Sequence, residues 1–173
     1  LKVDVIEAGF PVASPGDFES VKLIAEEIKG SKIAGLSRAL EKDIEATARA
    51  LEKAESPRIH VFLSTSKTHR EHMVQKAKVE IIEMGVKSIQ FARKYCDDVE
   101  FSPMDATRTE KEFLAEVTRE VISAGACTVN IPDTVGYTVP EEFSDLIRYL
   151  KINVENIDQA VISVHCHNDL GLA

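Results

Sequence analysis

Two histidines near the end of the chain, in the segment His165-Cys166-His167-Asn168-Asp169, are the strongest candidates for chemistry. The residues before them alternate between apolar and polar types, which predicts a strand. Since strand side chains alternate between two faces, His165 and His167 share a face. Two imidazoles at a strand end can bind one divalent ion, or can simply be hydrogen-bonded. Cys166 has the opposite parity, so we expect it in the core, facing the helices.

A second candidate is the segment Asn130-Ile131-Pro132-Asp133-Thr134-Val135-Gly136. Asn130 and Thr134 share one face if the backbone stays extended, and their side chains can hydrogen-bond a carboxylate or a carbonyl group. Proline, aspartate and glycine are also typical of a plain turn. The two interpretations are compatible, because barrel sites are built from the loops that follow strands.

Two glutamates and one arginine form a third group of candidates. Glu100 lies inside a strand-like segment, where a carboxylate is costly to bury unless it is paired or used. We predict that Glu100 is a base or orients one, and the alternative is a structural pair with an internal arginine or lysine. Glu7, in the first strand-like segment, is likewise either functional or paired with a cation. Arg38 is the obvious cation, which either binds an anionic substrate or pairs with one of these glutamates. His69 and His72, on a predicted helix, are expected on the solvated surface.

Composition excludes several classes of protein. The 173 residues include 21 Lys and Arg and 29 Asp and Glu, a formal net charge of −8, which argues against a nucleic-acid partner. No apolar run approaches the ~18 residues of a membrane span, so no membrane partner is expected. The three cysteines lack metal-knuckle spacing and indicate free thiols in a reducing compartment, the cytoplasm. Leu1-Lys2-Val3-Asp4-Val5 has no signal-peptide pattern and is strand-like, which predicts a piece of a longer protein.

Short β-branched segments alternate with longer amphipathic ones. The predicted strands are Val3–Ala8, Ile33–Leu36, Ile59–Leu63, Val99–Phe101, Thr128–Ile131 and Val161–Val164. The predicted helices are Asp17–Lys29, Glu41–Ala54, His69–Lys94 with a break near Gly85, Glu110–Ala124 and Pro140–Leu150. Repeated βα units of this size predict a parallel sheet with helices outside.

The residues within the strands distinguish two architectures with a parallel sheet, an open doubly wound sheet and a closed barrel. In the third strand, His60, Phe62 and Ser64 alternate with aliphatic residues, and polar groups gather toward the carboxyl ends of the other strands. An open doubly wound sheet would be almost continuously apolar, whereas a (β/α)8 TIM barrel places a site at this end. A complete barrel needs about 250 residues and eight strands. We therefore expect an α/β fold with about six strands of an incomplete TIM barrel.

Several segments together resemble the 2-isopropylmalate synthases, a family in the metal-dependent Claisen-condensation and lyase superfamily, which is built on a TIM barrel. The most specific of them is Asn-Ile-Pro-Asp-Thr-Val-Gly-Tyr-Thr at residues 130–138. The resemblance covers the whole chain, and the other segments that carry it are residues 7–11, 14–18, 95–102 and 165–173.

The resemblance implies that residues 1–173 are strands two to seven of a catalytic barrel. It implies the condensation of acetyl-CoA with 2-oxoisovalerate to 2-isopropylmalate and CoA in leucine biosynthesis, by a cytoplasmic homodimer. It also implies a divalent ion (Mg, Mn or Zn) as cofactor and acetyl-CoA as co-substrate. The residues that it implicates are His165 and His167 as metal ligands, Glu100, His60, Asn130 and Thr134 around the substrates, and Glu7 and Arg38 near the mouth.

The first strand of that family, with a metal-binding aspartate and a catalytic arginine, lies outside this sequence. A further asparagine ligand, the last strand and the regulatory C-terminal region also lie outside it. We therefore expect the isolated chain to be inactive. The alternatives are a homocitrate or citramalate synthase, a metal-dependent hydrolase on the same barrel, and a non-catalytic fragment. Leu36, His60 and Phe62 favour a small branched apolar substrate over one with a second carboxylate.

Overall fold

A computed structural model describes residues 3–173, so Leu1 and Lys2 of the strand-like start lie outside the described part. Six strands form one sheet in chain order, and every neighbouring pair is parallel. The strands are β1 (Val5–Gly9), β2 (Lys32–Arg38), β3 (Pro57–Ser64), β4 (Val99–Met104), β5 (Thr128–Asp133) and β6 (Val161–Cys166). Each predicted strand is therefore confirmed, and its observed ends differ from the predicted ones by a few residues.

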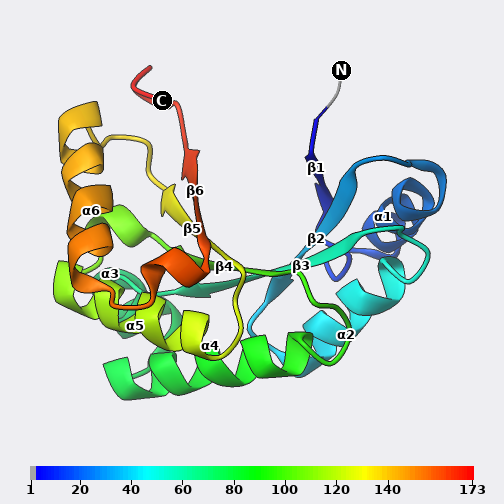
Figure 1. Cartoon of the computed structure of the whole chain (residues 1–173), viewed down its shortest axis with the longest axis horizontal. Helices are drawn as coiled ribbons and strands as arrows, with labels where there is room; N and C mark the ends of the chain where they lie inside the picture. The colour runs from blue at the N-terminus through cyan, green and yellow to red at the C-terminus, as the bar shows by residue number, and fades with distance from the viewer. Residues whose placement is uncertain (1–2) are drawn as a thin grey trace.

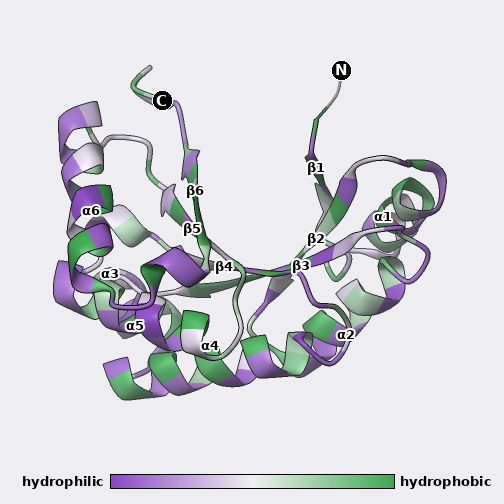
Figure 2. Ribbon diagram, viewed as in Figure 1, coloured by the Kyte–Doolittle hydropathy of each residue, from purple (hydrophilic) through white to green (hydrophobic). Residues whose placement is uncertain are grey.

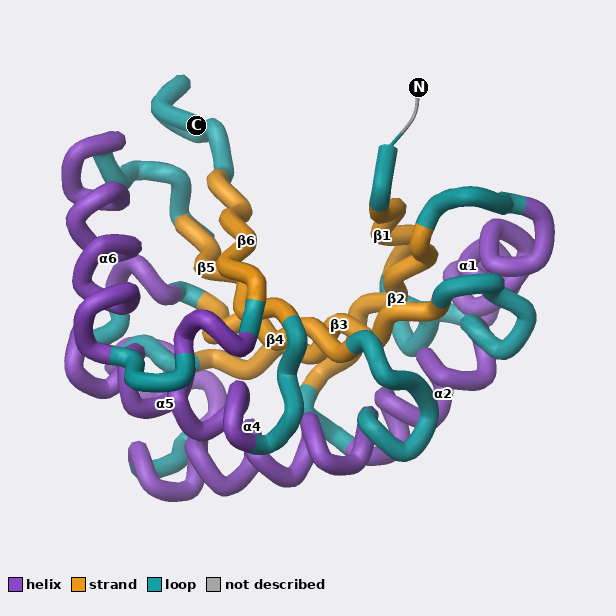
Figure 3. The backbone as a smooth tube through the Cα atoms, in the orientation of Figure 1, coloured by secondary structure: helices purple, strands orange, loops and turns teal. Residues whose placement is uncertain are grey.

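The helices lie on the convex side of a sheet that curls into part of a barrel, with β1 and β6 at its two edges (Figures 1 and 3). This confirms the incomplete TIM barrel. The helical segments are α1 (Pro15–Glu27), α2 (Glu41–Ala50), α3 (Lys67–His69), the π-helix η1 (Arg70–Val74), α4 (Lys78–Ala92), the 3-10 turn η2 (Ala106–Arg108), α5 (Lys111–Ser123), α6 (Pro140–Asn153) and the 3-10 turn η3 (Ile157–Gln159). Within residues 3–173, no helix has the length and apolar character needed to cross a membrane.

The core lies between the convex face of the sheet and these helices, which carry both hydrophobic and hydrophilic residues (Figure 2). Alternate residues of the central strands, such as Ile59, Val61, Phe101 and Ile131, are almost completely buried there. Burial of these aliphatic and aromatic side chains supplies the main favourable free energy of folding. The residues between them therefore face the concave side, as the alternation in the sequence predicts.

Helices α1 and α6 begin at residues that favour the start of a helix. Ser14 precedes α1 and its hydroxyl oxygen accepts the Asp17 N–H at 3.1 Å, which satisfies one of the free amides of the first turn. Pro15 and Pro140 occupy the first turns of α1 and α6, where a missing N–H costs nothing.

The break predicted near Gly85 is wrong. The long helical segment is interrupted at Gln75, which has a left-handed backbone with φ of 51°, and α4 continues through Gly85. Gly85 is buried, and an added Cβ would lie 3.3 Å from Val121 Cγ1 and 3.5 Å from Phe101 Cζ. Glycine at this position lets α4 approach α5 and the sheet closely, so it serves packing and not a bend.

Gly35 offers a test of the same kind of packing in the sheet. An added Cβ would lie 2.7 Å from Thr47 Cγ2 and 3.3 Å from Leu51 Cδ1, both outside β2. We expect Gly35→Ala to lower the free energy of unfolding of the full-length protein by ~1–3 kcal/mol through overpacking. Gly16→Ala is the matched control, because its Cβ would lie 3.6 Å from Ser14 Oγ, an ordinary contact. Equal denaturant midpoints for both variants would contradict this packing.

Candidate functional site

A cavity of about 230 Å³ opens on the concave face, where the carboxyl ends of the strands converge. Every strand contributes to it, directly or through the loop that follows. The lining residues are Glu7, Leu36, His60, Phe62, Ser102, Met104, Asn130, Pro132, Thr134, His165 and His167. In barrel proteins this end of the strands carries the active site. Six of the predicted site residues line the cavity, while Glu100 and Arg38 do not.

A chain of hydrogen bonds crosses the floor of the cavity from β1 to β5. The Glu7 carboxylate accepts from His60 Nδ1, while His60 Nε2 lies 2.7 Å from Ser102 Oγ. Ser102 Oγ in turn accepts from Asn130 Nδ2 at 2.8 Å. With its Nδ1–H donated to Glu7, His60 keeps Nε2 within hydrogen-bonding distance of the Ser102 hydroxyl. The sequence analysis did not single out Ser102, although its position two residues after Glu100 places it on the polar face.

The Glu7 carboxylate is partly buried beside two histidines. Burial raises its pKa, but the hydrogen bond and charge of His60 and the charge of His165 outweigh burial, so the pKa lies below its ordinary value. Glu7 is therefore a carboxylate in the neutral pH range, and it fixes which ring nitrogen of His60 carries the proton.

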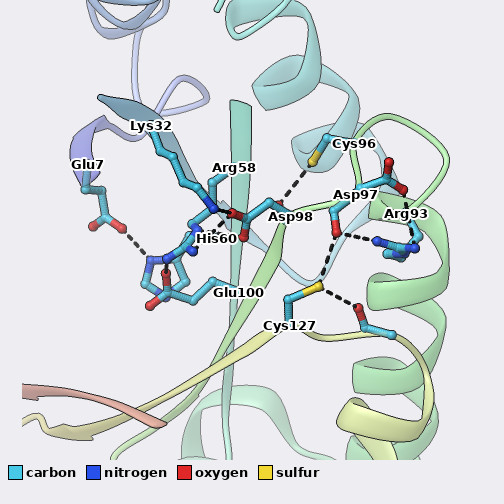
Figure 4. Close-up of polar contacts among 11 residues, drawn as sticks. Glu7, Lys32, Arg58, His60, Arg93, Cys96, Asp97, Asp98, Glu100 and Cys127 are labelled. Atoms are coloured by element: carbon cyan, nitrogen blue, oxygen red, sulfur yellow. Dashed lines mark hydrogen bonds and ion pairs between the residues drawn. The ribbon is translucent and has the colours of Figure 1, made fainter. Parts of the chain in front are cut away.

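Glu100 does not line the cavity, although its register partner His60 does. It lies two residues before the cavity residue Ser102 on β4. Its Oε2 accepts from Arg58 Nη1 at 2.9 Å, and its Oε1 lies 3.9 Å from His60 Nε2 (Figure 4). Arg58 also binds Asp98 (Figure 4). The internal arginine considered as the alternative partner of Glu100 is therefore present.

Arg38 pairs with neither glutamate, so that predicted pairing is wrong. Its Nε donates to Asp43 Oδ2 at 2.5 Å, because α2 begins only three residues after β2 ends and brings Asp43 close. Its guanidinium lies 5.8 Å from the centre of the Phe10 ring. Arg38 lines a neighbouring cavity of about 160 Å³, which shares Phe62 with the first cavity.

The loop after β5 holds the end of β6 in place. The buried Asp133 side chain accepts from the Thr138 N–H at 3.0 Å and the Thr107 hydroxyl at 3.1 Å, and its carbonyl accepts the His167 N–H at 3.2 Å. Gly136 has φ of 64°, and an added Cβ would lie 2.7 Å from the His167 carbonyl oxygen. The segment is thus both a turn and part of the cavity wall, as the sequence allowed.

His165 and His167 share one face, as predicted. Their rings stack with centroids 5.0 Å apart, both are exposed, and both line the cavity. Within residues 3–173 neither ring is hydrogen-bonded to another side chain, so their nitrogens can coordinate a divalent ion. Within the same residues there is no group of three His, Cys, Asp or Glu side chains that could hold a metal. The pair therefore fits two positions of a coordination shell and needs further ligands.

Two other predictions need correction. Cys166 lines a cavity with Phe143 of α6, on the predicted side of the sheet, but it is exposed because β6 is an edge strand. His69 is not on the solvated surface: only 17% of its side chain is exposed, and its Nε2 lies 3.8 Å from Asp105 Oδ2. Asp105 is completely buried and was not identified from the sequence. His72 is exposed, as predicted.

Known proteins resemble this chain over its whole length. It is 58% identical to the 2-isopropylmalate synthase of Pyrococcus furiosus and 62% identical to that of Methylacidiphilum infernorum, matching 35% and 34% of those proteins. The chain thus spans about a third of the length of these relatives.

Solved structures share the fold. The HMG-CoA lyase of Brucella melitensis superposes with a TM-score of 0.75 at 22% identity, over 99% of this chain and 62% of that one. The hydroxymethylglutaryl-CoA lyase of Pseudomonas aeruginosa gives a TM-score of 0.74 at 22% identity, over 98% of this chain and 58% of that one. Residues 1–173 also match the HMGL-like family throughout. The chain therefore belongs to the HMGL-like family.

Proposed function

We propose that the full-length protein carrying this segment is a 2-isopropylmalate synthase, which condenses acetyl-CoA with 2-oxoisovalerate to give 2-isopropylmalate and CoA in leucine biosynthesis. The observation that carries the proposal is the identity of 58% and 62% to proteins of that name, over a chain whose polar residues converge on one cavity. The catalytic residues named below belong to this proposal.

The lining of the cavity supports a 2-oxoacid with a small apolar side chain. Leu36, Phe62, Met104 and Pro132 give the cavity an apolar lining beside its polar groups. Among the described residues that line the cavity there is no lysine or arginine. A second carboxylate, as a homocitrate synthase requires, would therefore have no lysine or arginine among these lining residues as a partner. This favours 2-oxoisovalerate over a dicarboxylic oxoacid.

The exposed histidine pair is the proposed metal site, with His165 and His167 as ligands of a divalent ion. Such an ion, when bound, polarises the ketone of the oxoacid and stabilises negative charge on its oxygen. Asn130 and Thr134 are proposed to hydrogen-bond the oxygen atoms of the oxoacid and to hold it in one orientation.

Removal of a proton from the acetyl methyl group requires a base. His60, held by Glu7 at one nitrogen, lines the cavity and is proposed to contact the substrates. Glu100 does not line the cavity, and we therefore assign it a positioning role, acting through the charge that it places 3.9 Å from His60 Nε2. Arg38, beside Phe10 and the neighbouring cavity, is proposed to attract the anionic CoA.

Three free cysteines are typical of a reducing compartment, and we propose that the protein acts in the cytoplasm on small molecules. The net charge of −8 disfavours a nucleic-acid partner. The homodimer implied by the resemblance stays a prediction, which the mass of the full-length protein in solution tests.

The full-length protein should be assayed with acetyl-CoA and a panel of 2-oxoacids, with release of the CoA thiol as the signal. We expect the highest kcat/KM with 2-oxoisovalerate, and a preference of about 10- to 200-fold over an oxoacid that differs by one methylene. Residues 1–173 alone should release no CoA. Highest activity with a dicarboxylic oxoacid or with pyruvate would replace this proposal by one of the sister synthases, and no CoA release with any oxoacid would reject the class.

A further inference from the structure

Asp105, just after β4, has an unusual backbone. Its φ of 68° and ψ of 39° lie in the left-handed region, which aspartate adopts more readily than most residues but still at a cost. Among the described residues only Gln75 is another non-glycine residue with positive φ. Asp105 is also completely buried. A strained, buried residue beside a cavity must be held in place by its surroundings, and such strain is concentrated at functional sites.

The surroundings hold Asp105 at its side chain and at its carbonyl group. Arg108 Nε donates to both carboxylate oxygens at 2.8 and 3.0 Å, and Ser66 adds a further hydrogen bond. The Asp105 carbonyl accepts the Thr109 hydroxyl at 2.9 Å. Burial raises the pKa of Asp105, but the hydrogen bonds from Arg108 and Ser66 outweigh burial and lower it. The residue is therefore a carboxylate with a fixed orientation.

The remaining polar atom of Asp105 is its N–H, which donates to Thr134 Oγ1 at 2.9 Å. A threonine hydroxyl has one proton to donate and an oxygen that accepts. Within residues 3–173 the Thr134 hydroxyl accepts this hydrogen bond and donates to no other group of the protein, and Thr134 lines the cavity. The Asp105 N–H takes one of the two lone pairs of this oxygen and thereby orients the hydroxyl, whose proton can then be donated to an acceptor in the cavity.

The cavity contains one other hydroxyl among its described lining residues, that of Ser102. Ser102 Oγ accepts from Asn130 and lies 2.7 Å from His60 Nε2. Both hydrogen-bond partners of the Ser102 hydroxyl are therefore groups of the protein. The two hydroxyl groups differ in this respect, and Thr134 is the one that can donate to a ligand.

We propose that Asp105 is a positioning residue, whose strained backbone aims its N–H at Thr134 and thereby makes the Thr134 hydroxyl a donor to an oxygen of the bound 2-oxoacid. The inference rests on the proposed function. Because this hydrogen bond is available before and during the reaction, its loss should raise KM and leave kcat almost unchanged.

A double-mutant cycle in the full-length protein tests the coupling. Thr134→Val should raise KM for the oxoacid about 10-fold. Asp105→Ala, which loses the clamp and disfavours positive φ, should raise it by a similar factor. The double variant should be no worse than Thr134→Val, since both remove one interaction. Asp105→Gly adopts positive φ freely and keeps the N–H, so its KM should stay close to the unsubstituted value.

Hydrogen exchange gives a readout that does not depend on activity. Exchange of the Asp105 amide, measured by mass spectrometry, should be faster in Thr134→Val and unchanged in Thr134→Ser, which keeps the hydroxyl. Unchanged exchange in Thr134→Val would refute the hydrogen bond itself, even if an Asp105 variant fails to fold.

The matched control is Glu110→Gln, which breaks the nearby Arg70–Glu110 pair (2.9 Å) away from the cavity and should lower Tm with unchanged KM. KM effects that multiply in the Asp105→Ala/Thr134→Val variant would overturn the proposal, as would an Asp105→Gly variant as impaired as Asp105→Ala. Absence of CoA release with every oxoacid would instead reject the proposed function, while the exchange result would still stand.

Discussion

Replacement of His165 or His167 by alanine in the full-length protein is expected to remove the bound divalent ion and the activity together. Both rings face the cavity, stacked with centroids 5.0 Å apart, and no described residue is hydrogen-bonded to either ring. Loss of an outer partner of a metal ligand costs about 10- to 100-fold in affinity or activity. Loss of a ligand itself should therefore lower kcat/KM by more than about 100-fold.

The measurements are metal content by elemental analysis, kcat/KM and the melting curve. Both histidines are exposed, so we expect little change in Tm of the metal-free protein. His72→Ala is the matched control, because His72 is an exposed histidine on η1, outside the cavity lining. Full activity with stoichiometric metal in His167→Ala would disprove the assignment of this ligand.

Glu100→Gln is expected to lower kcat by about 100-fold, near the lower end of what a positioned acid or base contributes. The substitution keeps the volume of the side chain but removes a negative charge 3.9 Å from His60 Nε2. Arg58 keeps its two hydrogen bonds to Asp98, at 2.8 and 3.1 Å, so the half-buried guanidinium retains an anionic partner. We therefore expect Tm to fall only slightly.

Asp98→Asn separates a role in catalysis from a role in packing. It weakens the same ion-pair network on the side away from the cavity, where Asp98 pairs with Arg58 and Lys32 (Figure 4). We expect this variant to melt at a lower temperature with kcat unchanged. If Glu100→Gln and Asp98→Asn both lower Tm and leave kcat unaltered, then Glu100 is a structural partner of Arg58 and its positioning role is withdrawn.

Most of the fold can be predicted from this sequence because its signals are local. Alternation of apolar and polar residues follows the strand repeat of two, so it reveals both the strands and the face that carries polar groups. Pro140 at the first turn of α6 is likewise a local signal. The break at Gln75 could not be predicted in this way. Gly85 was wrongly predicted as a break, because its role depends on contacts with Val121 and Phe101 from distant segments.

The candidate site could likewise be predicted only in part from local signals. Parity along one strand correctly predicted that His165 and His167 share a face and line one cavity with residues such as Thr134. Parity cannot reveal which partner a side chain contacts. Glu100 faces the concave side as expected and pairs in register with the cavity residue His60, but its carboxylate is bound by Arg58 and does not line the cavity.

The order of the elements, the inward face of each strand and the residue types at the carboxyl ends all follow from the sequence alone. The pairing of groups emerges only in the folded chain: His60 with Glu7 and Ser102, Arg38 with Asp43, and Thr134 with the Asp105 N–H. The two kinds of information differ in the distance along the chain over which they act. The face on which a strand residue lies is set by the backbone dihedral angles of its neighbours. A hydrogen bond depends on ångström-scale distances between segments, which strand register and loop packing set together.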